Sequence, residues 1–428
     1  MKNKKTVNRI ANTFSKLPPN VKFYLTIAAI ACGMAGMFFL GYGLLSLFDR
    51  GRSEYTSDRS PNPPVLVPSP PVTATAPTQN QPSVPLPNQS SVPLENQPST
   101  PATTKPTVPS KQQPDTYQVI GQTNFKKPSA KLESVVNRIV KYSKDKNLPL
   151  QALSISLIDT QTGERADYQG NVHRYPASVV KMFWLVAAYQ KIDKGEIDGN
   201  VLRPAIEQMI YKSDNQGASQ VIDAITQTKS NSDKLSATEL SIAKQQRQQL
   251  NAFFSQAGYS QDINVSQKTF PIPQEKIMEP QGFDRQLRGD NLQRPIRNKL
   301  TTNDAARLMS EIVNARSISL EASKKMRGLL GRNVDPGFWK KQPPNPIDFN
   351  PVESFFGEGL PVGKTENIVS KAGWTSASRQ EVAFIKSKDG KTRYVLAIFG
   401  DDDAYSKNKK IFPEISKLVY SQMRQLSK

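Results

Sequence analysis

The stretch YPASVVKMFWLVAAY, residues 175–189, decides the fold of this chain. Tyr175 and Pro176 predict an extended segment, and the residues after Lys181 are apolar on nearly every face, which is typical of a helix at the centre of a domain. Ser178 and Lys181 stand three positions apart, so their side chains lie on the same helical face. The pattern therefore places a hydroxyl and an amine together where a buried helix begins.

A serine hydroxyl in this position needs a base, because it is a weak nucleophile at neutral pH. Lys181 can act as that base if burial and a neighbouring cation lower its pKa, and Lys371 is the candidate cation. The N–H groups at the start of the helix would stabilise a developing oxyanion. Taken alone, however, a Ser-x-x-Lys spacing is more often a helix start with a solvated lysine.

Two further motifs follow along the chain. Ser213-Asp214-Asn215 stands between two segments with helical spacing, where it also has the usual composition of a capping turn. Lys371-Ala372-Gly373 precedes a predicted hairpin, with strands at 381–386 and 393–399 around a turn at 388–391. The three motifs together supply a serine acyl-transfer site that uses no histidine.

The residue counts argue against other classes of hydrolytic site. The chain has one histidine, His173, and one cysteine, Cys32. Catalytic zinc sites draw two or three histidines together with a carboxylate or cysteines, so we expect no metal site and no cofactor. A Ser-His-Asp triad would have to use His173, a few residues before Ser178, and a partly exposed loop histidine is the commoner case. Cys32 lies within an apolar run, which argues against a catalytic thiol.

With these motifs the chain resembles the penicillin-recognising serine hydrolases, in particular their class A β-lactamase-like branch, which carries S-x-x-K, S-D-N and K-T-G. The resemblance covers about residues 130 to 428. It includes 250–258, similar to the family's helix before its omega loop, and 300–309, similar to the Thr-rich start of the next helix. The fold that it implies is α+β, an antiparallel sheet packed against a helical subdomain.

The resemblance also implies a role for each motif residue. Ser178 would be the acylated nucleophile, Lys181 its base, and Ser213 a proton shuttle to the leaving nitrogen. The backbone N–H groups of Ser178 and Trp374 would form the oxyanion hole. The residues that bind the substrate would be Asn215, Lys371, Gly373 and Trp374.

Three departures from the family pattern bear on turnover. Ala372 replaces a hydroxyl residue that would bind the substrate carboxylate, a loss of about 0.5 to 1.5 kcal/mol for a neutral hydrogen bond and up to about 3 for a charged one. The spacing between the first two motifs is shorter than is usual in class A enzymes, which indicates that a chain segment beside the site is shortened. An ungapped reading of 283–291 puts Leu287 where the family keeps its water-activating glutamate. The candidate substitutes, unless they are ordinary solvated acids, are Asp290, Glu275 and Glu279.

The N-terminal part predicts a membrane anchor. Residues 23–48 carry no charge and are long enough to span a hydrocarbon core of about 30 Å. Residues 1–22 hold six lysines and arginines and no acid. The positive-inside rule therefore keeps this arm in the cytoplasm and places the rest of the chain on the outer, periplasmic side of a bacterial inner membrane. A cleaved signal peptide is the alternative, although the apolar run exceeds a usual h-region.

Residues 49–127 predict a disordered linker. They are rich in proline, serine, threonine, asparagine and glutamine, with 16 of the 33 prolines between Pro61 and Pro114, and such a segment cannot bury a core. The remaining residues, 128–428, form one domain. Within it we expect helices at 130–145 and 410–426, a helical centre from 178 to 325, and strands at 152–158, 165–168, 381–386 and 393–399. The stretch from Gly331 to Pro361 should form a long surface loop.

The net charge of +20 lies mostly on this domain and favours anionic wall polymers over nucleic acid as partners, because no nucleic-acid motif accompanies it. The leading hypothesis is a membrane-anchored serine hydrolase of β-lactamase type, acylated at Ser178 by a strained cyclic amide. The first alternative is a peptidoglycan D,D-peptidase or a slow-turnover penicillin-binding protein. A non-catalytic wall-binding module with the same fold is the second.

Overall fold

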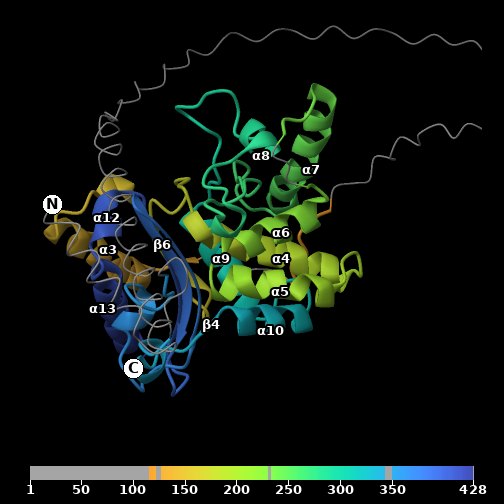
Figure 1. Ribbon diagram of the computed structural model, residues 1–428. Helices are drawn as coiled ribbons and strands as arrows, with labels where there is room; N and C mark the ends of the chain where they lie inside the picture. Colours follow the sequence, from red (N-terminus) through yellow and green to blue (C-terminus); the bar gives the residue numbers. More distant parts are fainter. Residues whose placement is uncertain (1–114, 122–126, 230–232, 343–348, 428) are drawn as a thin grey trace, which may run out of the picture. The chain divides into compact units, whose positions relative to one another are not determined.

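A seven-stranded sheet forms the centre of the computed structural model, which describes residues 115–121, 127–229, 233–342 and 349–427 (Figure 1). Its strand order is β1-β3-β2-β7-β6-β5-β4, and every neighbouring pair except β1 with β3 is antiparallel. The strands are β1 (Lys127–Pro128), β2 (Leu153–Asp159), β3 (Glu164–Tyr168), β4 (Gly331–Arg332), β5 (Ile368–Thr375), β6 (Ser378–Lys386) and β7 (Arg393–Gly400).

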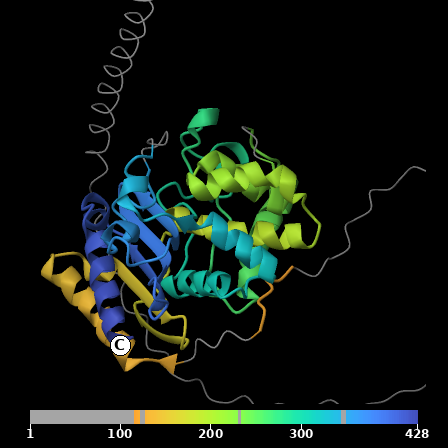
Figure 2. The same cartoon turned by 90° about the horizontal axis from the view of Figure 1, so that it is seen from below.

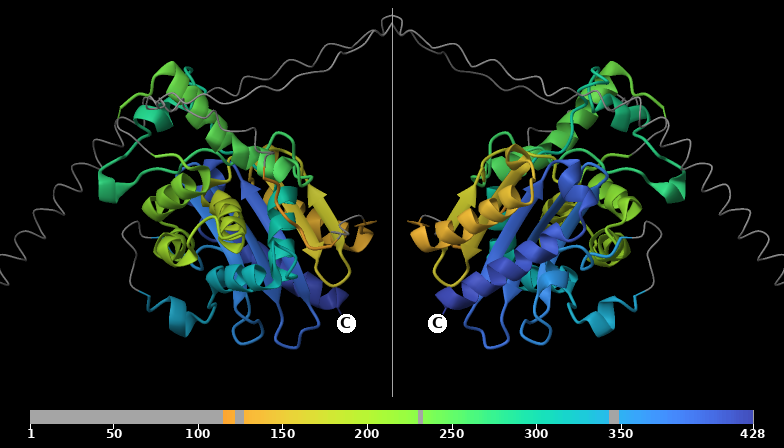
Figure 3. Two further views of the ribbon diagram at one scale, coloured as in Figure 1. Left: turned by 90° about the vertical axis from the view of Figure 1, so that its right-hand side faces the viewer. Right: turned by 90° about the vertical axis from the view of Figure 1, so that its left-hand side faces the viewer.

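Helices cover both faces of this sheet (Figures 1 and 2). On one face α3 and α13 lie side by side (Figure 3), and on the other α9 packs on β2, β6 and β7 in front of the remaining helices. The helices are α3 (Ala130–Asp145), α4 (Val180–Asp193), α5 (Gly199–Tyr211), α6 (Asn215–Thr226), α7 (Ala237–Ser255), α8 (Gly282–Gln286), α9 (Thr302–Val313), α10 (Leu320–Leu329), α11 (Pro336–Trp339), α12 (Asp403–Lys407) and α13 (Ile411–Leu426). Short 3-10 helices are η2 (Leu150–Ala152), η3 (Ala177–Val179), η4 (Pro273–Glu275) and η5 (Phe356–Gly359).

The central strands are apolar because both of their faces are covered. Along β7, Leu396 and Ile398 belong to the apolar cluster beneath α3 and α13, whereas Val395, Ala397 and Phe399 belong to the cluster shared with the other helices. Side chains of a strand point alternately to its two faces, so a strand covered on both sides becomes an almost continuous apolar run. The predicted α+β arrangement agrees with this architecture.

Helix α4 is the buried helix that the opening stretch predicts. Ten of its fourteen residues are buried, and Trp184 donates its indole N–H to the carbonyl of Val265 at 2.7 Å. Helices α5, α6, α9 and α10 surround it within one apolar cluster. Because α4 has no solvated face, its first turn is held firmly where the chain enters from Ser178.

Two segments differ from the expectations. Tyr117, inside the predicted linker, is 3% exposed; it donates its N–H to the carbonyl of Phe253 at 3.0 Å and packs against the rings of Phe254 and Tyr259. The folded part therefore begins before residue 128. The stretch from Gly331 to Pro361 is not only a surface loop, because it forms β4, α11 and η5.

Within the described ranges no helix is long and apolar enough to cross a membrane. The predicted arm at 1–22, the predicted membrane helix at 23–48 and the linker up to residue 114 lie outside those ranges.

Candidate active site

Ser178 lies in η3, directly before α4, and β5 runs against it. A Cβ atom on Gly373 would stand 2.8 Å from the backbone nitrogen of Ser178 and 2.9 Å from the carbonyl oxygen of Pro176. Only glycine allows this approach, since ordinary contacts begin near 3.4 Å. Ala177 has φ 44°, in the left-handed region, which is strained for a residue with a Cβ and is typical of functional turns. The first and third motifs are thus joined through their backbones.

Lys181 is completely buried one turn into the same helical segment. Its Nζ donates to the carbonyl of Ser213 at 2.5 Å and to Oδ1 of Asn215 at 2.7 Å. Burial lowers the pKa of Lys181 to about 7, against an opposing effect of Asp214. A neutral amine has two N–H donors and one lone pair, so the two hydrogen bonds leave the lone pair free to accept a proton.

The cause of that pKa shift differs from the expectation. Burial accounts for the lowered pKa of Lys181, whereas the mutual repulsion of the two lysines appears at Lys371. The pKa of Lys371 lies well below its usual value, first because Lys371 is buried and then because Lys181 and Arg332 are near it.

Ser213 connects the two lysines. Its carbonyl accepts from Lys181, and its hydroxyl accepts from Nζ of Lys371 at 2.9 Å. The φ angle of Ser213 is 55°, in the left-handed region. The next residue, Asp214, is the N-cap of α6, and its side chain accepts from the N–H of Gly217 at 2.7 Å. The capping and catalytic interpretations of Ser213-Asp214-Asn215 are therefore compatible.

The surroundings of Lys371 are cationic. Arg332 is buried and close enough to Lys371 to lower the pKa of that lysine, and burial raises the pKa of Glu381, a buried carboxyl whose charge also reaches Lys371, to about 8. Near neutral pH this carboxyl therefore offsets little of the positive charge. A carboxylate on a substrate is the complementary partner for such a site.

A loop that the motifs did not point to completes the group. Thr269 donates its hydroxyl to Oδ1 of Asn215 at 2.8 Å, and Asn215 donates from Nδ2 to the carbonyl of Pro271 at 2.8 Å. The peptide bond between Phe270 and Pro271 is cis. Thr269 and Pro271 thus hydrogen-bond to Asn215, which in turn accepts from Lys181. The sequence carries no periodic signal that would have identified them.

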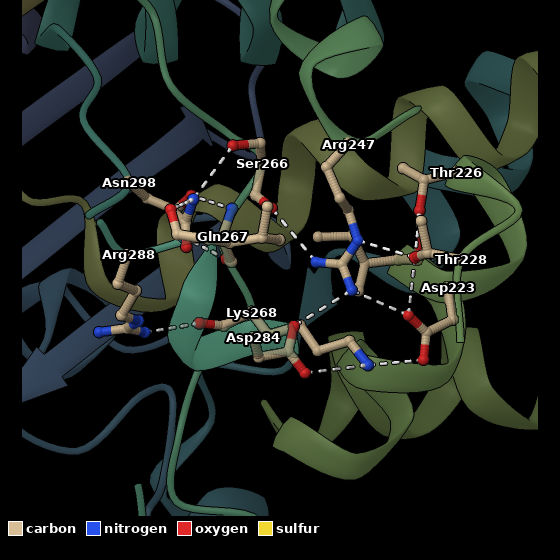
Figure 4. Close-up of polar contacts among 12 residues, drawn as sticks. Asp223, Thr226, Thr228, Arg247, Ser266, Gln267, Lys268, Asp284, Arg288 and Asn298 are labelled. Carbon is tan, nitrogen blue, oxygen red and sulfur yellow. Dashed lines mark hydrogen bonds and ion pairs between the residues drawn. The ribbon is translucent and has the colours of Figure 1, made fainter. Parts of the chain in front are cut away.

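Buried charges anchor this loop from behind (Figure 4). Arg247 on α7 is 0% exposed and pairs with Asp223 at 2.9 Å and Asp284 at 3.3 Å. Lys268, the residue before Thr269, pairs with Asp223 at 2.5 Å and lies 3.9 Å from Asp284. Four elements, α6, α7, α8 and the loop, therefore meet in one network of two cations and two anions.

The remaining predicted site residues lie as follows. Trp374 follows Gly373 on β5 and is 49% exposed, while the methyl group of Ala372 is buried in the apolar cluster beneath α3 and α13. Leu287 is buried against Phe283 and Ala243, and Asp290 is exposed beyond α8. Neither Leu287 nor Asp290 joins the hydrogen-bonded group around Lys181.

Glu275 and His173 have partners elsewhere. Glu275 accepts from Nε2 of Gln216 at 2.7 Å, and Nε2 of His173 is 2.7 Å from the hydroxyl of Ser260. Across the residues that the structure describes, no cluster of three or more histidines, cysteines and acids is arranged to hold a metal ion. Ser178, the two lysines, Ser213 and Asn215 are thus the chemical groups that the fold brings together.

Comparison with solved structures finds matches of low sequence identity. A β-lactamase from Sphaerobacter thermophilus DSM 20745 is similar in structure, with 18% identity over 68% of this chain and 98% of that chain and a TM-score of 0.46. The structure of PBP-A matches with 17% identity over 70% of this chain and 98% of that chain, at a TM-score of 0.45. TLA-3 extended-spectrum β-lactamase matches with 16% identity over 69% of this chain and 100% of that chain, at a TM-score of 0.48.

No curated protein matches the chain in sequence. The profile of the family described as "Beta-lactamase enzyme family" matches residues 131–423, which is more than half of the chain and includes all three motifs. The chain belongs to the beta-lactamase enzyme family.

Proposed function

We propose that the protein is a serine hydrolase of β-lactamase type, in which Ser178 opens the ring of a β-lactam and becomes acylated. The observation that carries this proposal is the buried Lys181, whose pKa is lowered to about 7 and whose two N–H donors are bound by the Ser213 carbonyl and by Asn215. That geometry suits a lysine that accepts a proton rather than one that neutralises a charge.

The reaction would begin when the Ser178 hydroxyl gives its proton to the lone pair of Lys181 and its oxygen attacks the lactam carbonyl carbon. The backbone N–H groups of Ser178 and Trp374 would hold the oxyanion. When the carbon–nitrogen bond breaks, the nitrogen would take a proton from the Ser213 hydroxyl, and that hydroxyl would regain one from the Lys181 ammonium, which returns to its neutral form while Nζ of Lys371 stays hydrogen-bonded to the Ser213 oxygen. Lys371 would also receive the substrate carboxylate.

A fluorescent penicillin tests the assignment. We expect covalent labelling of the wild type, none of Ser178→Ala, and labelling slower by orders of magnitude in Lys181→Ala because the base is lost. Intact-protein mass measures the adduct independently. Undiminished labelling of Ser178→Ala would refute the nucleophile, and a folded wild type that no penicillin labels would favour the non-catalytic wall-binding module.

The second candidate, a D,D-peptidase or slow-turnover penicillin-binding protein, is favoured by the loop beside Asn215. Hydrolysis of an acyl-enzyme needs a base within hydrogen-bond reach of the attacking water. Within the described residues no carboxylate hydrogen-bonds to Lys181, Asn215 or Thr269, and the residue between Thr269 and Pro271 is a phenylalanine. We therefore expect a burst of about one product per enzyme with a chromogenic cephalosporin, followed by slow turnover.

Two glutamate variants test whether residue 270 or residue 287 occupies the position of the water-activating carboxylate. Phe270→Glu puts a carboxylate between the two residues that contact Asn215, so we expect it to speed the steady phase. Leu287→Glu is the matched control, because Leu287 is buried against Phe283 and a glutamate there should destabilise the protein without speeding turnover. Faster turnover of Leu287→Glu alone would restore the ungapped register. Rapid turnover of the wild type that Asp290→Asn abolishes would assign deacylation to Asp290.

We further propose that the uncharged run at 23–48 anchors the protein in the inner membrane, with the domain on the periplasmic side and the Pro-rich segment as a tether. The support is the basic arm at 1–22 and the absence of charge across the run. Protease added outside the membrane should cut the tether and release an active soluble fragment. Mature protein that lacks the apolar run would show a cleaved signal peptide instead.

A further inference from the structure

Three chain segments lie beside one another next to Ser178. Arg174 forms both backbone hydrogen bonds of an antiparallel pair with Leu300, at 2.9 and 3.0 Å, and Asn264 does the same with Lys299, at 3.0 and 2.9 Å. The segment that ends at residue 300 therefore lies between the one that leads to Ser178 and the one that leads to Thr269. Because the pairing is antiparallel, residues shortly before Leu300 lie beside those that follow Arg174.

Two arginines from this part of the chain lie over aromatic rings that border the site. The guanidinium carbon of Arg297 is 5.7 Å from the centre of the Tyr175 ring, and that of Arg288 is 5.6 Å from the centre of the Phe270 ring. Tyr175 precedes Ser178 by three residues, and Phe270 stands between the two loop residues that contact Asn215. Both arginines are therefore held next to the catalytic group.

A backbone contact fixes Arg288 further. Its Nη2 donates to the carbonyl of Lys268 at 3.1 Å, on the side of the loop away from the Arg247 network (Figure 4). Stacking on Phe270 and this hydrogen bond leave the guanidinium with unused N–H donors, since it has five. The Arg288 side chain is partly exposed and that of Arg297 is exposed, so a ligand can reach both.

Neither arginine is neutralised by an acid. In the described part of the chain, no ion pair within 4.0 Å includes Arg288 or Arg297. The acids whose charge reaches Arg288 are Glu279 and Asp284, and Asp284 is bound to Arg247. The charge of Arg297 acts on Asp401, but the two side chains form no ion pair within 4.0 Å in the described part of the chain.

The two guanidinium groups repel each other. Burial lowers the pKa of Arg288, and the positive charge of Arg297 lowers it further. Both charges also act on Tyr175, so the two arginines share one patch. An anion placed between them would relieve the repulsion and accept charge-assisted hydrogen bonds.

We propose that Arg288 and Arg297 form a subsite for a carboxylate on the acyl side chain of the substrate, distinct from the ring carboxylate assigned to Lys371. The subsite rests on the proposed function, because it selects among molecules that acylate Ser178. It makes the protein specific for acyl groups that carry a negative charge, and a single carboxylate is the smallest group that satisfies it.

Benzylpenicillin and carbenicillin provide a matched pair of probes, because carbenicillin adds one carboxylate to the side-chain carbon next to the amide. Acylation rate constants for both are measured by intact mass on the wild type, Arg288→Gln and Arg297→Gln. We expect the carbenicillin-to-benzylpenicillin ratio to fall about tenfold in each variant, as for the loss of one hydrogen bond to a charged group. The control is Arg203→Gln, an exposed position on α5, which should keep the wild-type ratio.

The same ratio in the wild type and in both variants would overturn the subsite. A second measurement keeps the test independent of acylation. In Ser178→Ala, which cannot be acylated, calorimetry should find tighter binding of carbenicillin than of benzylpenicillin, and adding Arg288→Gln should remove that preference. If neither penicillin labels the wild type, the proposed function fails, but tighter binding of carbenicillin by Ser178→Ala would still support the subsite. Equal affinities of Ser178→Ala for the two penicillins would refute the subsite.

Discussion

Replacement of Gly373 by alanine tests the contact on which the whole site depends. The added Cβ would stand 2.8 Å from the Ser178 nitrogen, 2.9 Å from the Pro176 carbonyl oxygen and 3.0 Å from the Ala177 Cβ. Two of these neighbours are backbone atoms that cannot swing away. Strand β5 and η3 must therefore separate by roughly half an ångström before the new methyl group fits.

The consequence should be larger for chemistry than for folding. Over-packing of this kind costs about 1–3 kcal/mol of stability, whereas a misplacement of about 1 Å at a reacting centre lowers rates by about 10²-fold. Half that displacement, at the residue that precedes Trp374, the proposed oxyanion donor, should slow acylation by about tenfold or more. Lys371, two residues earlier on the same strand, would move away from Ser213 together with it.

The assay is the rate of Ser178 labelling by a fluorescent penicillin, read beside a thermal denaturation curve. Gly328→Ala is the matched control, because a Cβ at that helical position meets no atom within 4 Å; it should label at the wild-type rate and gain about 0.5–1 kcal/mol of stability. Gly373→Ala that labels as fast as the wild type, with unchanged stability, would refute the close approach of β5 to Ser178.

Two further outcomes follow from burial and charge. The labelling rate should rise with pH through a midpoint near 7, because burial lowers the pKa of Lys181 to about 7 and only its neutral form, which fills from that pH upward, accepts a proton; a flat profile between about pH 5 and 9 would contradict this. Arg247→Met should lower the free energy of unfolding by about 3–5 kcal/mol, because it breaks the buried ion pairs with Asp223 and Asp284 and leaves Lys268 as their one remaining cation in the network. Arg424→Met at an exposed ion pair should change the free energy little; equal denaturation midpoints for the two variants would count against the network.

Elements with a local signal could be predicted from the sequence. The unbroken apolar run after Ser178 is α4, and the hairpin turn at 388–391 joins β6 to β7. Thr301 caps α9 by accepting from the N–H of Asp304 at 3.0 Å, as the Thr-rich start suggested. Each of these features depends on residues a few positions apart, so periodicity and capping chemistry are sufficient to identify it.

Elements that depend on distant contacts were missed. Tyr117 is an isolated aromatic residue in a polar, Pro-rich region, and its burial is explained by the distant rings of Phe253, Phe254 and Tyr259. Phe356 lies in a stretch whose glycines and prolines predicted a loop, yet its ring stacks on Phe412 at 5.2 Å and its N–H donates to Glu381 at 2.7 Å. Local composition reflects only residues that are close in sequence, whereas Tyr117 and Phe356 are buried by residues that are distant in sequence.

The same distinction separates the two halves of the proposed reaction. Acylation uses Ser178, Lys181 and Ser213, which stand on a helix start and a helix cap that are visible as motifs. Deacylation depends on which loop residue faces Asn215, and that register is set by Lys268, whose ammonium group is held by carboxylates of α6 and α8. A lysine in a loop looks the same in sequence whether it is solvated or buried, so the spacing to Leu287 was a poor guide. Sequence motifs could therefore identify the groups of the proposed acylation step, whereas the loop residues that lie beside Asn215 are decided by long-range contacts of the fold.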